Sequence, residues 1–509
     1  MKRKLVIFLI LILTITSFSA TFAHKGTTEI NISIDGKTVL FPDEKPFINA
    51  DSRVLTPVRF VAEALGGEVK WLEDTSTVVL TIGSTEIRFN IGESIATVND
   101  VEISFDTSAQ IINRRTYVPV RFISEVLGNE VEWEPSTDTV LIFTKEHKTF
   151  LSDSELEIYH NLNEYLRALE SNRNFNGSVL VAQNDNIILS KGYGKSNIEK
   201  NISNTSTTKH PIGSITKQFT AFAIMQLYEE GKIGLDDTLS MYFPEYGRGD
   251  EITIEHLLVH SSGIINYTDY PSFYSLKPEE MDIENIMALF ELAPLKFEPG
   301  TNWSYSNSGY LLLGYIVEMV SGMSLDIYFD EKIFKPLNMA NTGIAYKNSE
   351  KMFDSIGYTG NLTLSPISDR GVLSGAYGAG YLISTVEDLY LWDRSLNTEE
   401  LISNEINEMI FHSYMPIQND IGYGLGWFIQ DHNELGKVAF HGGNVPGFSA
   451  FISRFFDIDL VIIITTNQNA YEVEALFNQL FLIVSGVEVP LPEKKQNLLI
   501  EPTKIFERL

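Results

Sequence analysis

The chain has 509 residues, of which 44% are hydrophobic and 21% are charged, so it is long enough for two or three globular domains with full cores. Acidic residues outnumber basic ones by 67 to 38. The resulting net charge of −29 makes nucleic acid an unexpected partner, and the absence of cysteine excludes thiol nucleophiles, disulfides and cysteine-ligated metals.

Residues 1–23 have the layout of a secretory signal peptide. Three cations at 2–4 precede an apolar run over 5–18, and cleavage is expected after Ala23. The apolar run is shorter than the ~20 residues that cross a bilayer. We therefore expect a secreted or cell-surface protein, which stays in the membrane only if this segment is not cleaved.

Residues 24–148 contain an internal repeat. The sequence PVRF at 57–60 recurs at 119–122, and Trp71 recurs as Trp133. The sequence of each unit predicts a short helix that starts at the proline and ends at a glycine. A pair of strands that contains the tryptophan is predicted to follow. One unit has only a small core, so the two units are expected to pack together as a small α+β domain.

This repeat resembles the copper amine oxidase N-terminal-like domain of secreted and surface proteins in Gram-positive bacteria. Copper sites draw on histidine clusters, whereas His24 and His147, the histidines nearest to the repeats, lie outside them. We therefore expect no copper here. The domain is predicted to bind the cell wall or to act as a spacer.

A further domain is predicted over 149–490, in which helical and strand patterns alternate to about residue 488. Leucines and tyrosines recur every three to four residues over 154–171, which predicts a helix. Two β-rich runs within 178–190 flank Asn184-Asp185-Asn186, which predicts a hairpin. The segment 491–509 has prolines and mixed charge and is predicted to be a loosely docked tail.

The segment 211–231 carries the main chemical motif. Ser214 lies at the expected start of a helix that ends at Gly231, where free N–H groups and the positive dipole end stabilise an alkoxide or oxyanion. Lys217 follows at i+3 on the same face, where partial burial makes an ammonium lose its proton more readily. Taken alone, S-x-x-K is more often a capping serine and a solvated lysine.

Two further motifs follow in order. Tyr305-Ser306-Asn307 precedes an apolar helix, and His441-Gly442-Gly443, followed by Asn444, lies on an expected strand. Each tripeptide is common by chance, but all three motifs on their expected elements are not.

On these motifs, residues 155–488 resemble the serine β-lactamase and penicillin-binding-protein superfamily, and its class C branch most closely. The segments 257–263, 297–300 and 378–389 support the resemblance. It implies a β-lactamase/transpeptidase-like fold, in which helices flank an antiparallel sheet and a second subdomain is all-helical.

The resemblance also implies roles for the site residues. Ser214 would be acylated, and Tyr305 would exchange its proton with Lys217. An adjacent ammonium would lower the pKa of Tyr305. Whether Lys217 or Tyr305 is the base in the resting enzyme stays open. Asn307 would hydrogen-bond the substrate amide, and the backbone N–H groups of Ser214 and Asn444 would form the oxyanion hole.

One departure from the family pattern concerns the substrate. Many β-lactamases have K-T-G where this chain has His441-Gly442-Gly443, which are expected to line the substrate site. A lysine there helps bind a carboxylate, whereas histidine is mostly neutral at pH 7. The two glycines would let a substrate backbone approach closely.

The resemblance with this departure favours an exported DD-carboxypeptidase or D-aminopeptidase-like enzyme that acts on cell-wall or D-amino-acid peptides. A carboxylesterase or β-lactamase of the same fold is the alternative enzyme. A non-catalytic surface protein that binds penicillin or peptidoglycan is the alternative of another class. The expected partner is therefore a small peptide or ester substrate, with no cofactor.

Three smaller features have competing interpretations. His256 and His260 have metal-ligand spacing, but the stretch lacks the glutamate of a zinc peptidase, so no metal is expected. Ser384 and Glu387 predict a capping box. Tyr423 and Trp427 are expected in the core or along the substrate cleft.

Overall fold

The computed structural model describes residues 30–493 except 36, 50, 51, 100, 106, 135–137, 145–151, 174, 278, 279, 345–354, 361–364, 367–374, 419, 433, 434 and 469–471. The predicted signal peptide and residues 494–509 of the predicted tail lie outside the described residues. The described chain forms two compact units. The first holds residues 30–31, 41–123 and 133–140, and the second holds 32–40, 124–132 and the chain from 141. The predicted domain limits stay predictions.

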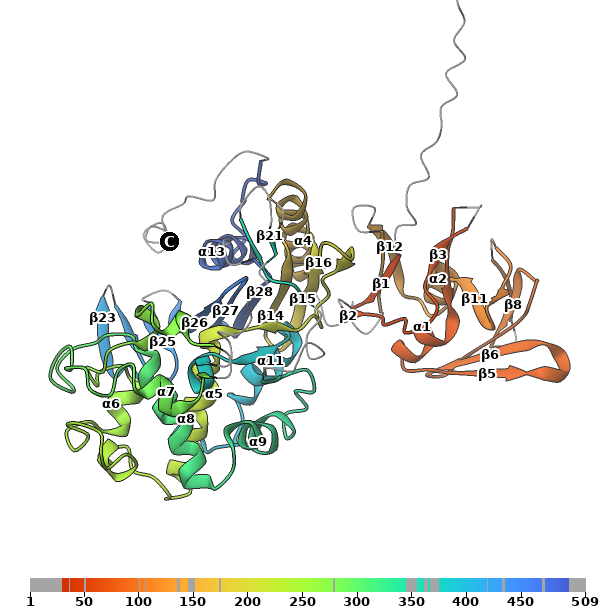
Figure 1. The fold of residues 1–509 in the computed structure, drawn as a ribbon. Coiled ribbons are helices and arrows are strands. Elements are labelled where there is room, and N and C mark those ends of the chain that lie inside the picture. Colours follow the sequence, from red (N-terminus) through yellow and green to blue (C-terminus); the bar gives the residue numbers. More distant parts are fainter. Residues whose placement is uncertain are drawn as a thin grey trace, which may run out of the picture. The chain divides into compact units, whose positions relative to one another are not determined.

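The first unit contains two antiparallel sheets of described strands (Figure 1). One sheet is a meander of β5 (Glu68–Leu72), β6 (Thr77–Ile82), β7 (Thr85–Asn90), β8 (Ile95–Val98) and β9 (Val101–Ser104). The other has the order β10 (Gln110–Ile112), β11 (Arg115–Pro119), β4 (Val54–Pro57) and β3 (Phe47–Ile48). In it β4 pairs with β11, with Pro57 opposite Tyr117. Equivalent strands of the two repeats are therefore neighbours, as predicted.

Each repeat continues with a short helix. The two helices are α1 (Val58–Ala64) and α2 (Val120–Val126), and each is followed by a glycine of positive φ, Gly66 or Gly128. Each proline is the last residue of a strand and not the first of the helix, so the predicted helix start was one residue too early. A further sheet has the order β12 (Glu130–Glu134), β13 (Thr139–Phe143), β1 (Asn31–Ile34) and β2 (Lys37–Thr38).

In the second unit, eight described strands form one antiparallel sheet in the order β15-β14-β28-β27-β26-β25-β24-β23. Their bounds are β14 (Gly177–Gln183), β15 (Asn186–Tyr193), β23 (Met415–Gln418), β24 (Ile421–Tyr423), β25 (Phe428–His432), β26 (Gly436–Val445), β27 (Phe448–Phe455) and β28 (Leu460–Thr466). β14 and β15 form the predicted hairpin, and Asn184 and Asp185 have the positive φ of its turn.

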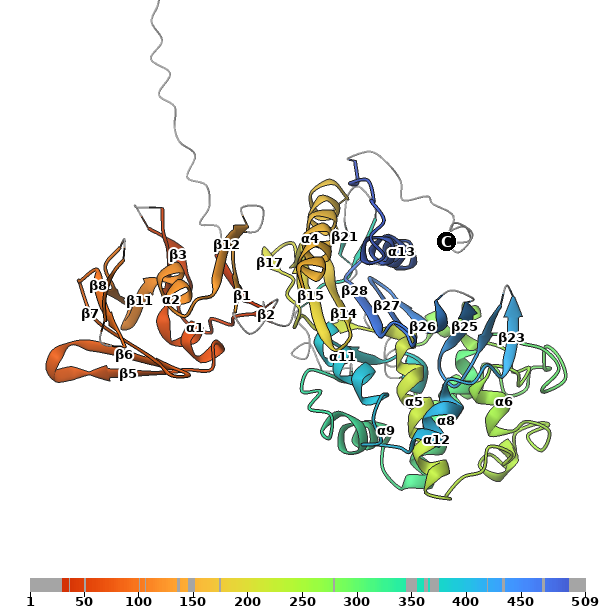
Figure 2. The same cartoon turned by 180° about the vertical axis from the view of Figure 1, so that it is seen from behind.

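Helices cover both faces of this sheet (Figures 1 and 2). One face packs on α4 (Asp153–Arg173), the predicted helix, and on α13 (Val473–Val484); the other packs on α5 (Thr216–Glu229), α8 (Asn307–Ser321) and α11 (Val386–Ser395). Side chains alternate along β14, so Val179 and Val181 enter the first core while Leu180 and Ala182 enter the second. The structure thus confirms the predicted sheet between helical layers.

Short elements complete the second unit. They are β16 (Lys195–Asn197), β17 (Ile202–Ser203), β18 (His210–Pro211), β19 (Gly343–Ile344), β20 (Tyr358–Thr359), β21 (Ser365–Pro366), β22 (Leu382–Ser384), α6 (Ile254–Leu258), α7 (Ile283–Met287), α9 (Leu325–Phe329), α12 (Asn404–Ile410), and the single turns η2 (Gly213–Ile215), η3 (Leu239–Met241), η4 (Tyr267–Asp269), η5 (Phe273–Ser275), η7 (Asp330–Phe334) and η8 (Tyr377–Ala379). Among the described residues of the first unit, one such turn is present, η1 (Glu73–Thr75).

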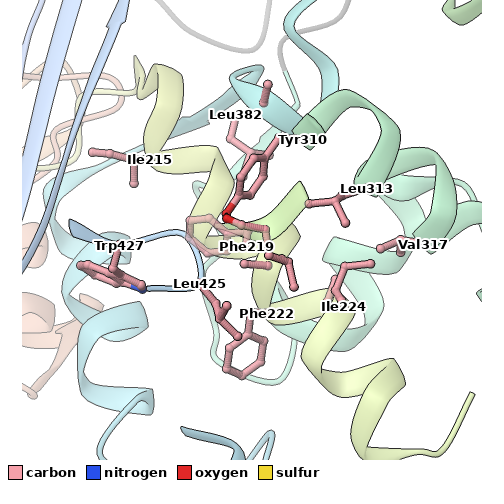
Figure 3. Close-up of a cluster of buried hydrophobic side chains, with 14 of the residues drawn as sticks. Ile215, Phe219, Phe222, Ile224, Tyr310, Leu313, Val317, Leu382, Leu425 and Trp427 are labelled. Carbon is pink, nitrogen blue, oxygen red and sulfur yellow. The ribbon is translucent and has the colours of Figure 1, made fainter. Parts of the chain in front are cut away.

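The helical core fixes α5 against α8. Figure 3 shows Phe219 and Phe222 of α5 beside Tyr310 and Leu313 of α8. Trp427 from the loop before β25 joins the same core, and both Trp427 and Tyr423 are fully buried. Of the two alternatives for these residues, burial favours the core. Because α5 is held from several sides, the residues at its start have little freedom to move.

Two details of this unit bear on earlier expectations. The predicted capping box at Ser384 and Glu387 was wrong by one residue, because the Thr385 side chain caps α11 and accepts from Asp388 N at 3.1 Å. Within the described ranges, no single helix has both the length and the apolar composition of a membrane span. Residues 307–321 and 325–334 pass together only as a pair bent by 79°.

Candidate active site

Ser214 lies in η2, the tight turn that leads directly into α5. Gly213 has a φ of +52°, and a Cβ added there would lie 2.7 Å from the backbone nitrogen of Asn444. A Cβ on Gly443 would overlap the carbonyl oxygen of Ile212 and lie 3.1 Å from the nitrogen of Ser214. The two glycines therefore let η2 lie against the backbone of β26, and they bring the backbone at Ser214 close to that at Asn444.

Lys217 makes three short polar contacts from a fully buried position. Its Nζ lies 3.1 Å from Ser214 Oγ, 2.7 Å from Asn307 Oδ1 and 2.7 Å from the carbonyl oxygen of Ala379. No carboxylate pairs with it within the described part of the chain, and its side chain is 0% exposed. Burial lowers the pKa of Lys217 well below its ordinary value, because desolvation penalises the ammonium.

An ammonium would donate to all three of these oxygens, but burial favours the neutral amine, which has two N–H bonds and one lone pair. The oxygens of Asn307 and Ala379 can only accept, so the two N–H bonds point to them. The lone pair is left for the hydroxyl of Ser214. Lys217 is therefore arranged to take the proton of Ser214.

Tyr305 lies beside the same pair. Its ring centroid is 4.8 Å from Lys217 Nζ, and interaction with Ser214 acts to lower the pKa of its hydroxyl. Burial raises the pKa of Tyr305 above its ordinary value and outweighs the lowering by Ser214. The expectation of a lowered pKa was wrong, because it assumed a charged ammonium beside the phenol. A protonated phenol and a neutral amine favour Lys217 as the resting base.

Asn307 begins α8 and is held by three hydrogen bonds. Its backbone N–H donates to Asn266 Oδ1 at 3.0 Å, its side-chain amide donates to Thr268 Oγ1 at 3.0 Å, and its carbonyl accepts from Lys217. These bonds orient the Lys217 amine, which is a role the motif did not predict. A hydrogen bond from Asn307 to substrate stays a prediction.

His441 is buried behind Tyr305 and is 2% exposed. Its Nδ1 lies 2.6 Å from the carbonyl oxygen of Gly442, so Nδ1 carries the proton, and its Nε2 accepts from the Tyr423 hydroxyl at 3.1 Å. Burial lowers the pKa of His441 to about 3, which keeps it neutral at pH 7. The contact of His441 with substrate stays a prediction.

Gly442 and Gly443 differ in the atoms that a Cβ added at each position would contact. A Cβ on Gly442 would come within 3.2 Å of the flexible Glu474 carboxylate, whereas one on Gly443 would strike backbone. Gly443 is thus required for the approach of η2, and the approach of a substrate backbone to the two glycines stays a prediction. Asn444 is exposed, and its side chain accepts from Ser449 Oγ at 2.7 Å.

Two contributors to the site were not identified from the sequence. Ala379 acts through its carbonyl oxygen, and the flanking Gly378 lets η8 approach α8 closely, since a Cβ there would lie 2.7 Å from Tyr310 O. The glycines around Ala379 were the available clue. His260 has its ring centroid 4.4 Å from that of Tyr305, and its Nδ1 accepts from the backbone of Ser306 at 3.2 Å.

His256 and His260 do not share a ligand position. His256 caps the start of α6, where its Nδ1 accepts from Thr253 N at 3.2 Å, while His260 lies beyond the helix with a φ of +60°. Among the described residues there is no group of three or more histidine, aspartate or glutamate side chains that would hold a metal ion. His260 instead positions Tyr305.

Comparison with known proteins shows the family to which the chain belongs. The family model described as Beta-lactamase matches residues 162–482, and that described as Copper amine oxidase N-terminal domain matches residues 33–142. Putative penicillin-binding protein PbpX of Bacillus subtilis (strain 168) is 29% identical, over 70% of this chain and 89% of its own length. Protein flp of Staphylococcus aureus (strain MRSA252) is also 29% identical, over 60% of this chain and 61% of its own length.

Solved structures of the same fold are similar to about two thirds of this chain. The octameric penicillin-binding protein homologue from Pyrococcus abyssi has a TM-score of 0.58 and 28% identity, over 65% of this chain and 78% of that chain. A D-stereospecific amidohydrolase from Streptomyces sp. has a TM-score of 0.52 and 25% identity, over 60% of this chain and 94% of that chain. A class C β-lactamase, at 20% identity and a TM-score of 0.56, shares the fold over 66% of this chain and 98% of that chain.

Proposed function

The chain belongs to the β-lactamase family of serine hydrolases, and from that premise we propose that it is an exported peptidase of the DD-carboxypeptidase or D-aminopeptidase kind. Its substrates are cell-wall or D-amino-acid peptides, and it works through an acyl-enzyme on Ser214. The observation that carries the proposal is the contact of the buried Lys217 amine with Ser214 Oγ at 3.1 Å.

In the first step the Lys217 lone pair takes the proton of Ser214 while Oγ forms a bond to the substrate carbonyl carbon. The negative charge on the carbonyl oxygen is stabilised by the backbone N–H groups of Ser214 and Asn444. Loss of one such donor typically costs about 10²–10³ in rate.

The second step expels the leaving group. The Tyr305 phenol gives its proton to the departing amine, and the Lys217 ammonium restores it to the phenolate. Water then attacks the acyl-enzyme with the same groups in reversed roles, so the enzyme returns to its starting protonation. The raised pKa of Tyr305 suits a proton donor.

His441 weighs against substrates that are held by a carboxylate, which include β-lactams and also peptides with a free C-terminal D-alanine, so within the peptidases it favours the D-aminopeptidase kind. Its neutral, buried imidazole cannot supply the positive charge that a lysine at this position offers to a substrate carboxylate. The similarity to a D-stereospecific amidohydrolase supports the same choice. A carboxylesterase is the second candidate, because an ester substrate needs no carboxylate anchor.

A panel of three substrates tests this proposal: a D-Ala-D-Ala peptide, p-nitrophenyl butyrate and a fluorescent penicillin. We expect turnover of the peptide to exceed turnover of the ester, slow labelling by penicillin, and loss of all three in Ser214→Ala. Ser154→Ala, on the exposed start of α4, is the control and should keep wild-type rates. Turnover that survives in Ser214→Ala would refute the serine mechanism, and ester turnover alone would favour the esterase.

A further inference from the structure

The first unit has a groove of about 390 Å³, distant in sequence from the motifs of the active site. This volume lies within the roughly 300–1,000 Å³ of ligand-binding clefts. The groove is formed by the start of α1, the strands β5 and β6, and the hairpin of β10 and β11. All of its lining residues belong to the first compact unit.

The charge of the groove is opposite to that of the chain. Four cations and no carboxylate line it, although acidic residues outnumber basic ones by 67 to 38 overall. The cations are Arg59, Lys70, Arg114 and Arg115. A local positive site on an acidic protein attracts anionic groups at short range, within the ~8 Å over which charges act at physiological salt.

Two of these cations form ion pairs with neighbouring carboxylates, and two do not. Arg115 pairs with Asp43, and Lys70 lies 3.9 Å from Glu68. Arg59 and Arg114 are exposed, and neither has an ion pair or hydrogen bond within the described ranges. Their guanidinium groups are free to bind a carboxylate or phosphate with paired N–H donors.

The same groove exposes apolar surface. Trp71 is 46% exposed and Ile111 is 51% exposed, while Val58 and Val78 are buried beneath them. An indole offers a broad, rigid apolar face that stacks on a planar or ring-shaped ligand. An aromatic ring beside free guanidinium groups suits a sugar ring that carries an acidic substituent.

The other repeat provides a natural comparison. At the 62-residue spacing, Trp71 corresponds to Trp133 and Arg59 to Arg121, but Lys70 corresponds to Glu132 and Arg114 to Ser52. The excess of positive charge is therefore specific to the groove at Trp71. The repeat alone does not require it, since the equivalent positions retain the helix, the strands and the tryptophan without it.

We propose that the groove lined by Arg59, Trp71 and Arg114 binds an acidic sugar unit of an envelope glycan, with Trp71 stacked on the ring and the two arginines on its carboxylate or phosphate. A sparsely charged glycan fits better than a dense polyanion, because the net charge of −29 repels the latter. The proposal does not depend on the chemistry at Ser214.

Retention of the full-length Ser214→Ala protein on immobilised glycans tests this. The first probe is peptidoglycan glycan strands stripped of peptide, whose sugars carry free carboxylates. The second is the same strands with the carboxylates amidated, and the third is a wall polymer of phosphorylated sugars. Removing the peptides keeps the catalytic cleft from contributing to retention.

We expect retention on at least one acidic probe, weaker retention on the amidated strands, and a decline as salt rises. Retention on the strands alone assigns carboxylate, and retention on the phosphorylated polymer alone assigns phosphate. Trp71→Ala and Arg114→Asn should each weaken it about fivefold or more. Asparagine suits position 114 because Arg114 has a φ of +67°.

Trp133→Ala and Arg53→Ala are matched controls in the same region and should retain wild-type binding. All variants should keep the wild-type melting temperature, and Trp71→Ala in the active enzyme should keep wild-type peptide turnover. Equal binding to amidated strands, loss of binding in Trp133→Ala but not Trp71→Ala, or no binding to either acidic probe would overturn the proposal.

Discussion

Lys217 is the residue whose protonation state decides how this site works. It is buried without a carboxylate partner in the described structure, and burial, rather than its three oxygen contacts, is what favours an amine over an ammonium. The cause is desolvation, which lowers its pKa far from the ordinary value of 10.5. Tyr305 moves in the opposite direction for the same physical reason, since burial also disfavours phenolate.

The pH profile of kcat/KM follows from this shift. Because the lowered pKa belongs to a base that must be neutral, activity should be full above the pKa of Lys217 and fall as pH drops through it. The fall should occur well below 10.5. Lys217→Arg, which keeps the charge but cannot lose its proton at these pH values, should reduce kcat about 10³-fold or more.

The measurement is a pH titration of p-nitrophenyl butyrate hydrolysis in wild type and Lys217→Arg. Tyr305→Phe, assayed on the D-Ala-D-Ala peptide, is the informative companion, because it should slow departure of the amine while leaving the acidic limb in place. An activity that rises only toward pH 10.5, as expected for an ordinary lysine, would show that Lys217 is not the base.

At the scale of elements, the site depends on how closely η2 and β26 approach each other. Gly213 and Gly443 face one another across this contact, and a Cβ on Gly443 would overlap a backbone oxygen that has no room to move. The adjacent Gly442 points to the opposite face of the strand, where only the end of a flexible carboxylate is near. Gly443 therefore matters for the approach of η2 to β26, whereas the neighbouring Gly442 does not.

Substitution of the two glycines tests this contact. Gly443→Ala should push η2 away from β26, displace an oxyanion donor and lower kcat about 10²–10³-fold. Gly442→Ala should cost at least tenfold less, because the Glu474 side chain can rotate away. Steady-state kinetics on both variants, with circular dichroism to verify folding, makes the comparison. Equal losses in the two variants would mean that the η2–β26 approach does not set the activity.

At the scale of the whole molecule, the periodic patterns of the sequence predicted the helices and strands well. They did not predict which distant residues come into contact. The helix at 154–171 and the hairpin at 178–190 appear as α4 and β14–β15, because their periodicity is local. Ala379 meets Lys217 across 162 residues and acts through a backbone oxygen, which leaves no mark in the residue type. The sequence singled out His260 only by its metal-ligand spacing from His256. Its contact with Tyr305 depends on the turn after α6, which that spacing does not predict.

The same contrast applies to the two units. The repeat of 62 residues predicted that its halves would pack, and the pairing of β4 with β11 confirms it. The positive groove depends on residues of α1, β5 and the β10–β11 hairpin, which the repeat pattern does not bring together. Sequence periodicity reports each element's own environment and not which distant residues share a surface.

The central claim is that Ser214 forms an acyl-enzyme, and trapping that intermediate tests it most directly. Acid quenching during turnover of p-nitrophenyl butyrate and of a D-Ala-D-Ala peptide, followed by peptide mapping in a mass spectrometer, locates the acyl group. We predict one acyl group on the peptide that contains Ser214, longer-lived in Tyr305→Phe and absent in Ser214→Ala. An acyl group on another residue, or undiminished turnover in Ser214→Ala, would contradict the account.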